Sequence, residues 1–109
     1  MAEEIKGIFI HHVYFWLVEP GHTGHKKLLI EGLKKLSRVE TIQRFHIGEA
    51  ANTSRDVIDS SYDISWILIF HNEADQGSYQ VDPIHLRFVD ECSHLWKTVK
   101  VYDTVDVMA

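Results

Sequence analysis

A tyrosine and a histidine flank a predicted helix start in the segment that runs from Tyr79 to Phe88. Asp82 can cap this helix with its carboxylate, and Pro83 suits the first helical position, where a missing N–H costs nothing. Tyr79 and His85 can both donate or accept protons, so we interpret them as candidate catalytic residues at a pocket near the helix start. The alternative interpretation is that His85 is a core histidine satisfied by a single hydrogen bond.

The chain has eight histidines in 109 residues, and two of them stand next to each other on a predicted strand. Neighbouring strand residues point to opposite faces, so only one of His11 and His12 can line a given cavity. His11 shares its face with Phe9 and Val13. We therefore expect His11 either to line the same pocket as His85, as a third candidate catalytic residue, or to be a hydrogen-bonded core residue.

The remaining histidines carry weaker signals. His46 and His71 are further candidates for pocket lining, whereas His94 lies off the apolar helix stripe and should be solvated. His22 and His25 stand three residues apart at the start of a predicted helix, a spacing at which two side chains can grip a metal. No third ligand is evident in the sequence, which favours an exposed polar helix start, and we expect neither a metal nor a cofactor.

The helix that begins at Pro83 is predicted to extend to Thr98, because apolar residues recur at the i, i+3, i+4 and i+7 spacing of a core-facing surface. The residues on this stripe are His85, Phe88, Val89, Cys92, Leu95, Trp96 and Val99. The lone Cys92 excludes an internal disulfide, and its place on the stripe predicts a small core hydrophobe.

The other elements follow from hydrophobic patterning and turn residues. We predict strands at residues 5–18, 40–49, 62–71 and 99–107, helices at 24–37 and 83–98, a loop at 50–61, and a short helical or turn segment at 72–80. The order β-α-β-β-α-β suits an α+β, ferredoxin-like fold, with a four-stranded antiparallel sheet and two helices on one face. Residues 1–109 are expected to form a single domain.

The first predicted strand is apolar on both faces, and two helices can cover only one of them. A second sheet from a symmetric partner is the simplest cover, so the sequence predicts a homodimer. Trp16 in the first strand and Val101 in the last are the residues whose truncation we expect to weaken association.

Composition limits the classes of partner. The chain has 11 Lys and Arg against 16 Asp and Glu, a formal charge of −5, which disfavours nucleic acid and anionic membranes as partners. The first 20 residues lack the polarity of a secretory signal, so a cytoplasmic location is expected. Glycine-rich phosphate loops, Gly-x-Ser-x-Gly elbows and Cys-x-x-Cys pairs are all absent from the sequence.

Three segments resemble the stress-responsive A/B barrel (Dabb) domain family: His11-His-Val-Tyr-Phe-Trp-Leu17, Tyr79-Gln-x-x-Pro-x-His-x-x-Phe88, and Trp96-Lys-Thr-Val-Lys-Val-Tyr-Asp103. The resemblance covers nearly the whole chain. It implies a ferredoxin-like protomer that pairs with its twin as a dimeric α/β barrel.

One branch of this family, the polyketide cyclases similar to olivetolic acid cyclase, implies roles for Tyr79, His85 and His11. An aldol-type ring closure needs a base to remove a proton and a donor to hold the developing enolate oxygen. A further histidine of that branch aligns with Ile64. The bulky residues Trp66 and Tyr62, which are close to Ile64 in sequence, are expected to leave less room for a long acyl chain.

Three functions therefore stay open at this point. The first is binding of a small hydrophobic or carbonyl-bearing molecule between sheet and helices, without turnover. The second is a cofactor-free cyclase or lyase of a polyketide-like substrate that uses Tyr79 and His85. The third is a haem- or quinone-handling monooxygenase of the same barrel architecture. Fold alone does not decide among them.

Overall fold

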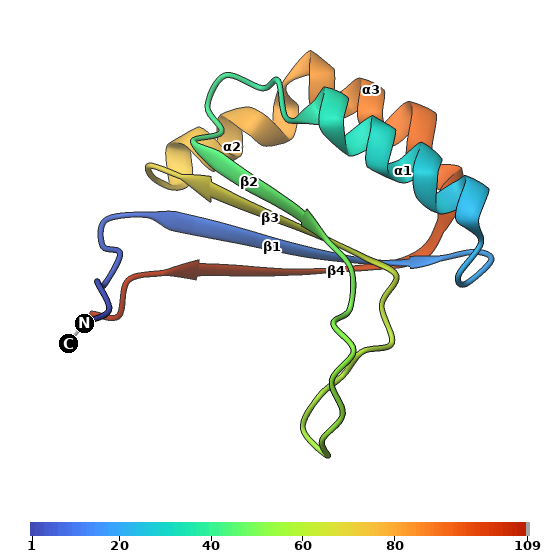
Figure 1. Ribbon diagram of the computed structural model, residues 1–109. Coiled ribbons are helices and arrows are strands. Elements are labelled where there is room, and N and C mark those ends of the chain that lie inside the picture. Colours follow the sequence, from blue (N-terminus) through green and yellow to red (C-terminus); the bar gives the residue numbers. More distant parts are fainter. Residues whose placement is uncertain (109) are drawn as a thin grey trace.

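The computed structural model describes residues 1–108, and its elements follow the predicted order with one helix added (Figure 1). The elements are β1 (Phe9–Leu17), α1 (Thr23–Leu36), β2 (Arg44–Gly48), β3 (Ile64–Phe70), α2 (Glu73–Val81), α3 (Pro83–Cys92), the short 3₁₀ helix η1 (Ser93–Leu95) and β4 (Trp96–Val105). The predicted ferredoxin-like α+β architecture is confirmed.

The four strands form one antiparallel sheet in the order β2-β3-β1-β4. All three α-helices of the described residues lie over the same face of this sheet, while the loop between β2 and β3 extends away from the other side (Figure 1). The two central strands, β1 and β3, come from distant parts of the sequence. Their register sets His11 opposite Leu68 on β3 and opposite Asp103 on β4.

The core lies between the sheet and the helices. Side chains of β1 alternate between buried and half-buried along its whole length, as expected when one face of a strand meets the helices. The inward-facing residues of β3 are equally buried, and the helices contribute a leucine stripe from α1. The principal core residues are Phe9, Val13, Phe15, Leu17, Leu29, Leu33, Leu36, Ile64, Trp66, Leu68, Phe70 and Leu95.

The predicted start of α3 is confirmed in detail. The carboxylate of Asp82 accepts a hydrogen bond from the backbone N–H of Ile84 at 2.8 Å, and Pro83 occupies the first turn. An aspartate cap followed by proline satisfies an orphan N–H group and sets the first helical φ angle. The chain therefore turns sharply between α2 and α3, which places Tyr79 and His85 on the two sides of one corner.

The predicted end of this helix is wrong. The α-helix stops at Cys92, and Trp96 begins β4 by pairing with Leu17 of β1. The helical spacing of apolar residues continues by coincidence through Leu95, Trp96 and Val99. Pairing with β1 overrides this local helical preference. Val89, assigned to the buried stripe, is 39% exposed. The segment predicted as helical or turn at 72–80 contains a full helix, α2, which Asn72 caps. Two strand predictions need correction: β2 is shorter than the predicted 40–49, and β4 begins at Trp96, three residues before the predicted start at Val99.

The sheet face opposite the helices, which we call the helix-free face, carries an aromatic group. The ring of Tyr14 contacts Tyr62 edge-on with centroids 4.9 Å apart, and Trp16 lies beside the same tyrosine. Ile67 and Ile69 add half-buried aliphatic surface to this face. No described helix is long and apolar enough to cross a membrane.

Candidate functional site

A cavity of about 440 Å³, here called the inner cavity, lies between the helix-covered face of the sheet and the pair α2–α3. Its walls come from β1, β3, β4 and both helices. The lining residues are His11, Val13, Phe15, Trp66, Gln76, Tyr79, Gln80, His85, Phe88, Val89, Trp96, Val99, Val101 and Asp103. This volume and a mainly apolar lining with a few converging polar groups are typical of small-molecule sites.

A histidine–aspartate pair forms one side of the inner cavity. His11 is buried on β1, and its Nδ1 atom lies 2.5 Å from Oδ1 of Asp103 on β4. Because an ionised carboxylate can only accept, Nδ1–H donates this bond, which leaves Nε2 of the neutral ring with a lone pair. The pairing fixes the tautomer and the orientation of the ring.

Tyr79 closes the cavity from the end of α2 and is 1% exposed. Its hydroxyl oxygen accepts a hydrogen bond from Nε1 of Trp66 at 3.1 Å. Burial raises the pKa of Tyr79 to about 12, an effect that the Trp66 bond partly opposes. The tyrosine is therefore neutral at pH 7, and its O–H group is available to donate to a bound molecule.

His85 lies on the first turn of α3 against Tyr79, with ring centroids 4.8 Å apart in an edge-on arrangement. Burial lowers the pKa of His85, and the nearby His11 lowers it further, whereas the backbone of Gln80 and the carboxylate of Asp82 act in the opposite direction. Its Nδ1 atom is buried without a hydrogen bond of good geometry among the described residues. An unsatisfied buried nitrogen beside a cavity is a polar group that a ligand can pair.

The three predicted site residues are thus brought together at one cavity. The ring centroid of Tyr79 lies 5.8 Å from that of His11 and 4.8 Å from that of His85. The chemistry on offer is a histidine with an oriented lone pair, a neutral phenol that donates, and a second histidine held neutral by burial. Together these groups can polarise a carbonyl and accept a proton next to it.

Two predicted pocket histidines lie elsewhere, and this prediction was wrong. The register pairs His46 of β2 with Ile67, which in turn pairs with His12, so His46 sits exposed on the helix-free face. His71 follows the end of β3 and is also exposed. Tyr62 belongs to the aromatic group of the helix-free face and does not narrow the inner cavity.

Asp103 is the residue of the candidate site that sequence reasoning missed. It lies 92 positions from His11, so its role depends on the register between β1 and β4. The one available signal was its place in an apolar strand, where an inward-facing carboxylate needs a partner. Val101, predicted to support dimerisation, shares this inward face and lines the cavity.

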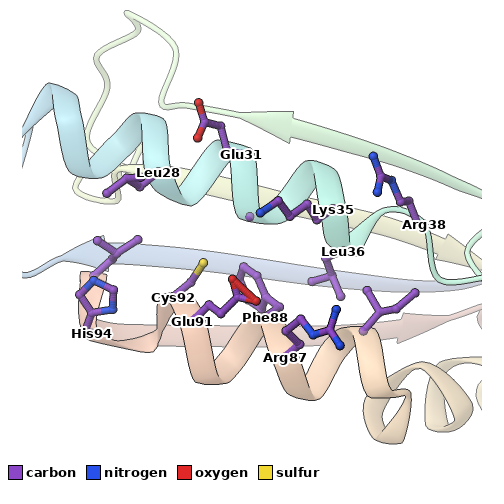
Figure 2. Close-up of a pocket in the computed structure, with 13 residues that line it drawn as sticks. Leu28, Glu31, Lys35, Leu36, Arg38, Arg87, Phe88, Glu91, Cys92 and His94 are labelled. Carbon is purple, nitrogen blue, oxygen red and sulfur yellow. The ribbon is translucent and has the colours of Figure 1, made fainter.

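A second cavity of about 420 Å³, the outer groove, lies between α1 and α3 (Figure 2). Phe88, Leu36 and Cys92 form its floor, and charged side chains such as Arg87 and Glu91 stand along its rim (Figure 2). It contains none of the predicted catalytic residues. The buried Cys92 is, as predicted, a small core residue, and burial raises the pKa of its thiol.

A third cavity opens on the helix-free face and is lined by His12, Tyr14, Trp16, Asp59, Tyr62, Lys100, Tyr102 and Thr104. Burial lowers the pKa of His12. This surface combines aromatic rings with a cation, since Nζ of Lys100 lies 5.3 Å from the centre of the Trp16 ring. A large aromatic patch of this kind is typical of a protein–protein contact.

Comparison with solved structures supports the fold. A Dabb family protein from Mesorhizobium loti, described as ferredoxin-like, is 23% identical, with 94% of this chain and 99% of that chain covered and a TM-score of 0.76. A dimeric ferredoxin-like protein of unknown function from Bacteroides fragilis is 17% identical, with coverage of 94% and 100% and a TM-score of 0.72. A hydroxynitrile lyase from Passiflora edulis is 16% identical, with coverage of 96% and 98% and a TM-score of 0.75.

At these identities the similarity establishes the fold alone. A comparison with curated proteins gave no match. The family model of the stress responsive A/B barrel domain, however, matches residues 10–106, which include all the residues that line the inner cavity. The chain therefore belongs to the stress responsive A/B barrel (Dabb) domain family.

Proposed function

We propose that the protein binds a small, hydrophobic, carbonyl-bearing molecule in the inner cavity. The observation that carries this proposal is the presence of three polar groups in the lining of one mainly apolar cavity. Those groups are the Tyr79 hydroxyl, the His11–Asp103 pair and the His85 ring. Apart from Gln76 and Gln80, the rest of the lining is aliphatic or aromatic and suits the apolar part of a ligand.

The donor in this arrangement is Tyr79. Its oxygen already accepts from Trp66, so the remaining hydroxyl proton is best used by an acceptor in the cavity. A carbonyl oxygen is such an acceptor, and His85 adds a second group that can pair with it. The raised pKa of Tyr79 and the lowered pKa of His85 keep both side chains neutral near pH 7. A neutral donor set favours a carbonyl over a strongly charged anion.

A second candidate function is cofactor-free acid–base chemistry on the same ligand, as in a cyclase or lyase. The observation that favours it is the His11–Asp103 pair, because a carboxylate that orients a histidine is a common way to prepare a general base. His11 would remove a proton next to the carbonyl while Tyr79 donates to the oxygen. The Passiflora edulis relative is named as a lyase and shares this fold, which supports the proposal through the fold alone.

Binding without turnover is our first proposal because one element of the cyclase resemblance has no counterpart. Ile64, which aligns with a further histidine of that branch, is 1% exposed and packs in the core, outside the lining of the inner cavity. Trp66 does occupy space in the cavity, where it also holds Tyr79.

We also propose that the protein is a homodimer that buries the helix-free face. Half-buried apolar and aromatic side chains cover this face, although none of the described helices packs on it. Relatives from several bacteria are described as dimeric. The cytoplasmic location and the absence of nucleic-acid or membrane partners stay predictions.

The function is tested by incubating the purified protein with a metabolite extract and identifying retained molecules by mass spectrometry. We expect retention of a carbonyl compound by the wild type and weaker retention by Tyr79→Phe. The control is Ser78→Ala, which removes an exposed hydroxyl of α2 that does not line the inner cavity. Equal retention by the wild type and Tyr79→Phe would contradict the proposed recognition.

Turnover separates the two candidate functions. With an enzyme, His11→Ala and His85→Ala should lower the rate by roughly 10²–10⁴-fold where the side chain is the base, and Tyr79→Phe by roughly 10²–10³-fold. With a binding protein, no substrate is consumed by any form, and each change alters affinity by about 1–3 kcal/mol.

A further inference from the structure

The turn between β1 and α1 brings together three side chains that ligate metals elsewhere in proteins. Glu19, His22 and His25 each present a ligand atom, and these three atoms lie within 4.8 Å of one another. Oε2 of Glu19 is 3.5 Å from Nε2 of His22 and 3.9 Å from Nδ1 of His25. The two imidazole rings face each other with centroids 4.0 Å apart. The sequence showed the two histidines, and the fold supplies the third ligand.

The backbone beneath this cluster is firmly held. Asp63 accepts hydrogen bonds from the backbone N–H groups of Leu17 at 2.9 Å and Gly21 at 3.0 Å, one on each side of the turn. The N–H of His22 also donates to the carbonyl of Glu19 at 3.1 Å. Gly21 has a φ angle of +73°, which glycine adopts without strain. The turn therefore presents Glu19 to the histidines through a fixed scaffold.

A second observation points to a ligand. Nδ1 of His25 is buried and has no hydrogen-bond partner among the described residues. Buried polar atoms are normally paired, so an orphan nitrogen aimed at a carboxylate and a second imidazole calls for a partner. Oε2 of Glu19, at 3.9 Å, is too far from this nitrogen for a hydrogen bond.

We propose that Glu19, His22 and His25 form a surface site for a divalent transition metal, with Zn²⁺ as the ion that fits the ligand set. Two imidazole nitrogens and one carboxylate oxygen make a three-ligand zinc site whose fourth position is open to water. Bonds of about 2.0–2.1 Å in tetrahedral geometry place ligand atoms about 3.3 Å apart. The observed separations therefore need only small side-chain rotations.

Coordination has one structural cost. Nδ1 of His22 now accepts the backbone N–H of His25 at 3.0 Å and so caps α1. In the neutral ring this places the proton on Nε2, and metal binding there requires the proton to move to Nδ1 and the cap to break. One helix cap is small beside the free energy of a multidentate zinc site. The site therefore predicts that zinc binding rearranges the first turn of α1.

The test is calorimetric titration of the chelator-treated full chain with Zn²⁺. The variants are Glu19→Gln, His25→Ala and His22→Asn, the last of which keeps a capping side chain and removes the imidazole. The control is His71→Ala, an exposed histidine outside the cluster. We expect one zinc per chain, affinity at least about 10-fold weaker in each of the three variants, and no change in the control.

Thermal unfolding supplies a second readout. Zn²⁺ should raise the melting temperature of the wild type and of His71→Ala but not of the three cluster variants, since a ligand that binds the native state stabilises it. Metal-free melting of the variants shows whether each still folds. Wild-type affinity in His25→Ala, or the absence of saturable binding in the wild type, would overturn the proposal.

Discussion

Replacing Tyr79 by phenylalanine tests how the inner cavity is held together. The change removes one oxygen and leaves the ring in place, so the indole N–H of Trp66 loses the acceptor it now reaches at 3.1 Å. Both side chains are 1% exposed, so the Trp66 N–H becomes a buried donor without its acceptor. An unsatisfied buried donor costs about 1–3 kcal/mol, and we expect the free energy of unfolding to fall by that amount.

The corresponding change in melting temperature follows from chain length. An unfolding entropy of about 2.1 cal/mol/K per residue gives about 0.23 kcal/mol/K for 109 residues, so each kcal/mol lowers the melting temperature by about 4 °C. We therefore expect a decrease of roughly 4–13 °C for Tyr79→Phe. The control Ser78→Ala removes a hydroxyl from an exposed residue of α2, outside the helix-free face, and should change little.

The assay is chemical denaturation of each variant at the same protein concentration, together with the double variant Tyr79→Phe/Trp66→Phe. Because the double variant removes both partners, its loss should be smaller than the sum of the two single losses. A Tyr79→Phe protein as stable as the wild type, or strictly additive losses, would refute the assignment of this hydrogen bond.

Three further predictions follow from the site and from the helix-free face. Burial lowers the pKa of His85 in the folded state, so the unfolded chain binds the proton more readily. The free energy of unfolding should therefore decrease as pH falls through the unfolded pKa of 6.5 and level off below the folded pKa. Denaturation of His85→Gln between pH 5 and 7.5 should show a weaker dependence of stability on pH. Asp103→Asn should let His11 populate both neutral tautomers, so the ¹⁵N chemical shifts of the ring should change from those of a protonated Nδ1 to those of a mixture of the two tautomers. An unchanged tautomer would contradict the pairing. Trp16→Ala should weaken self-association in analytical ultracentrifugation. Val101→Ala, on the cavity side of β4, should alter ligand binding and leave association intact. A wild type that is folded and monomeric at micromolar concentration would refute the homodimer.

Local sequence signals predicted the parts of the fold that depend on neighbouring residues. The Asp82-Pro83 pair gave the start of α3, and the alternation in β1 correctly placed His11 among inward-facing side chains. The apolar stripe of α3 misled at its far end, because Leu95 and Trp96 suit a helix and a buried strand equally well. Only pairing with β1 decides between the two.

Only part of the candidate site was predicted, because local sequence signals report on residues that are close in the chain. Tyr79 and His85 are close in sequence, so their proximity follows from one helix corner. The residues that hydrogen-bond to His11 and Tyr79 are distant from them in sequence. Asp103 reaches His11 through strand register, and Trp66 reaches Tyr79 through packing of β3 under α2. The hydrophobic periodicity of the sequence carries no information about contacts between residues so far apart in the chain.

Imidazole NMR during titration with the retained molecule tests the central claim most directly, because a different histidine reports on each cavity. His11 and His85 line the inner cavity, His94 lines the outer groove, and His12 lines the cavity of the helix-free face. We predict saturable shifts of the His11 and His85 resonances with one common dissociation constant, while those of His94 and His12 stay unchanged. Saturable shifts confined to His94 or His12 would place the ligand elsewhere and contradict a binding site between the sheet and α3.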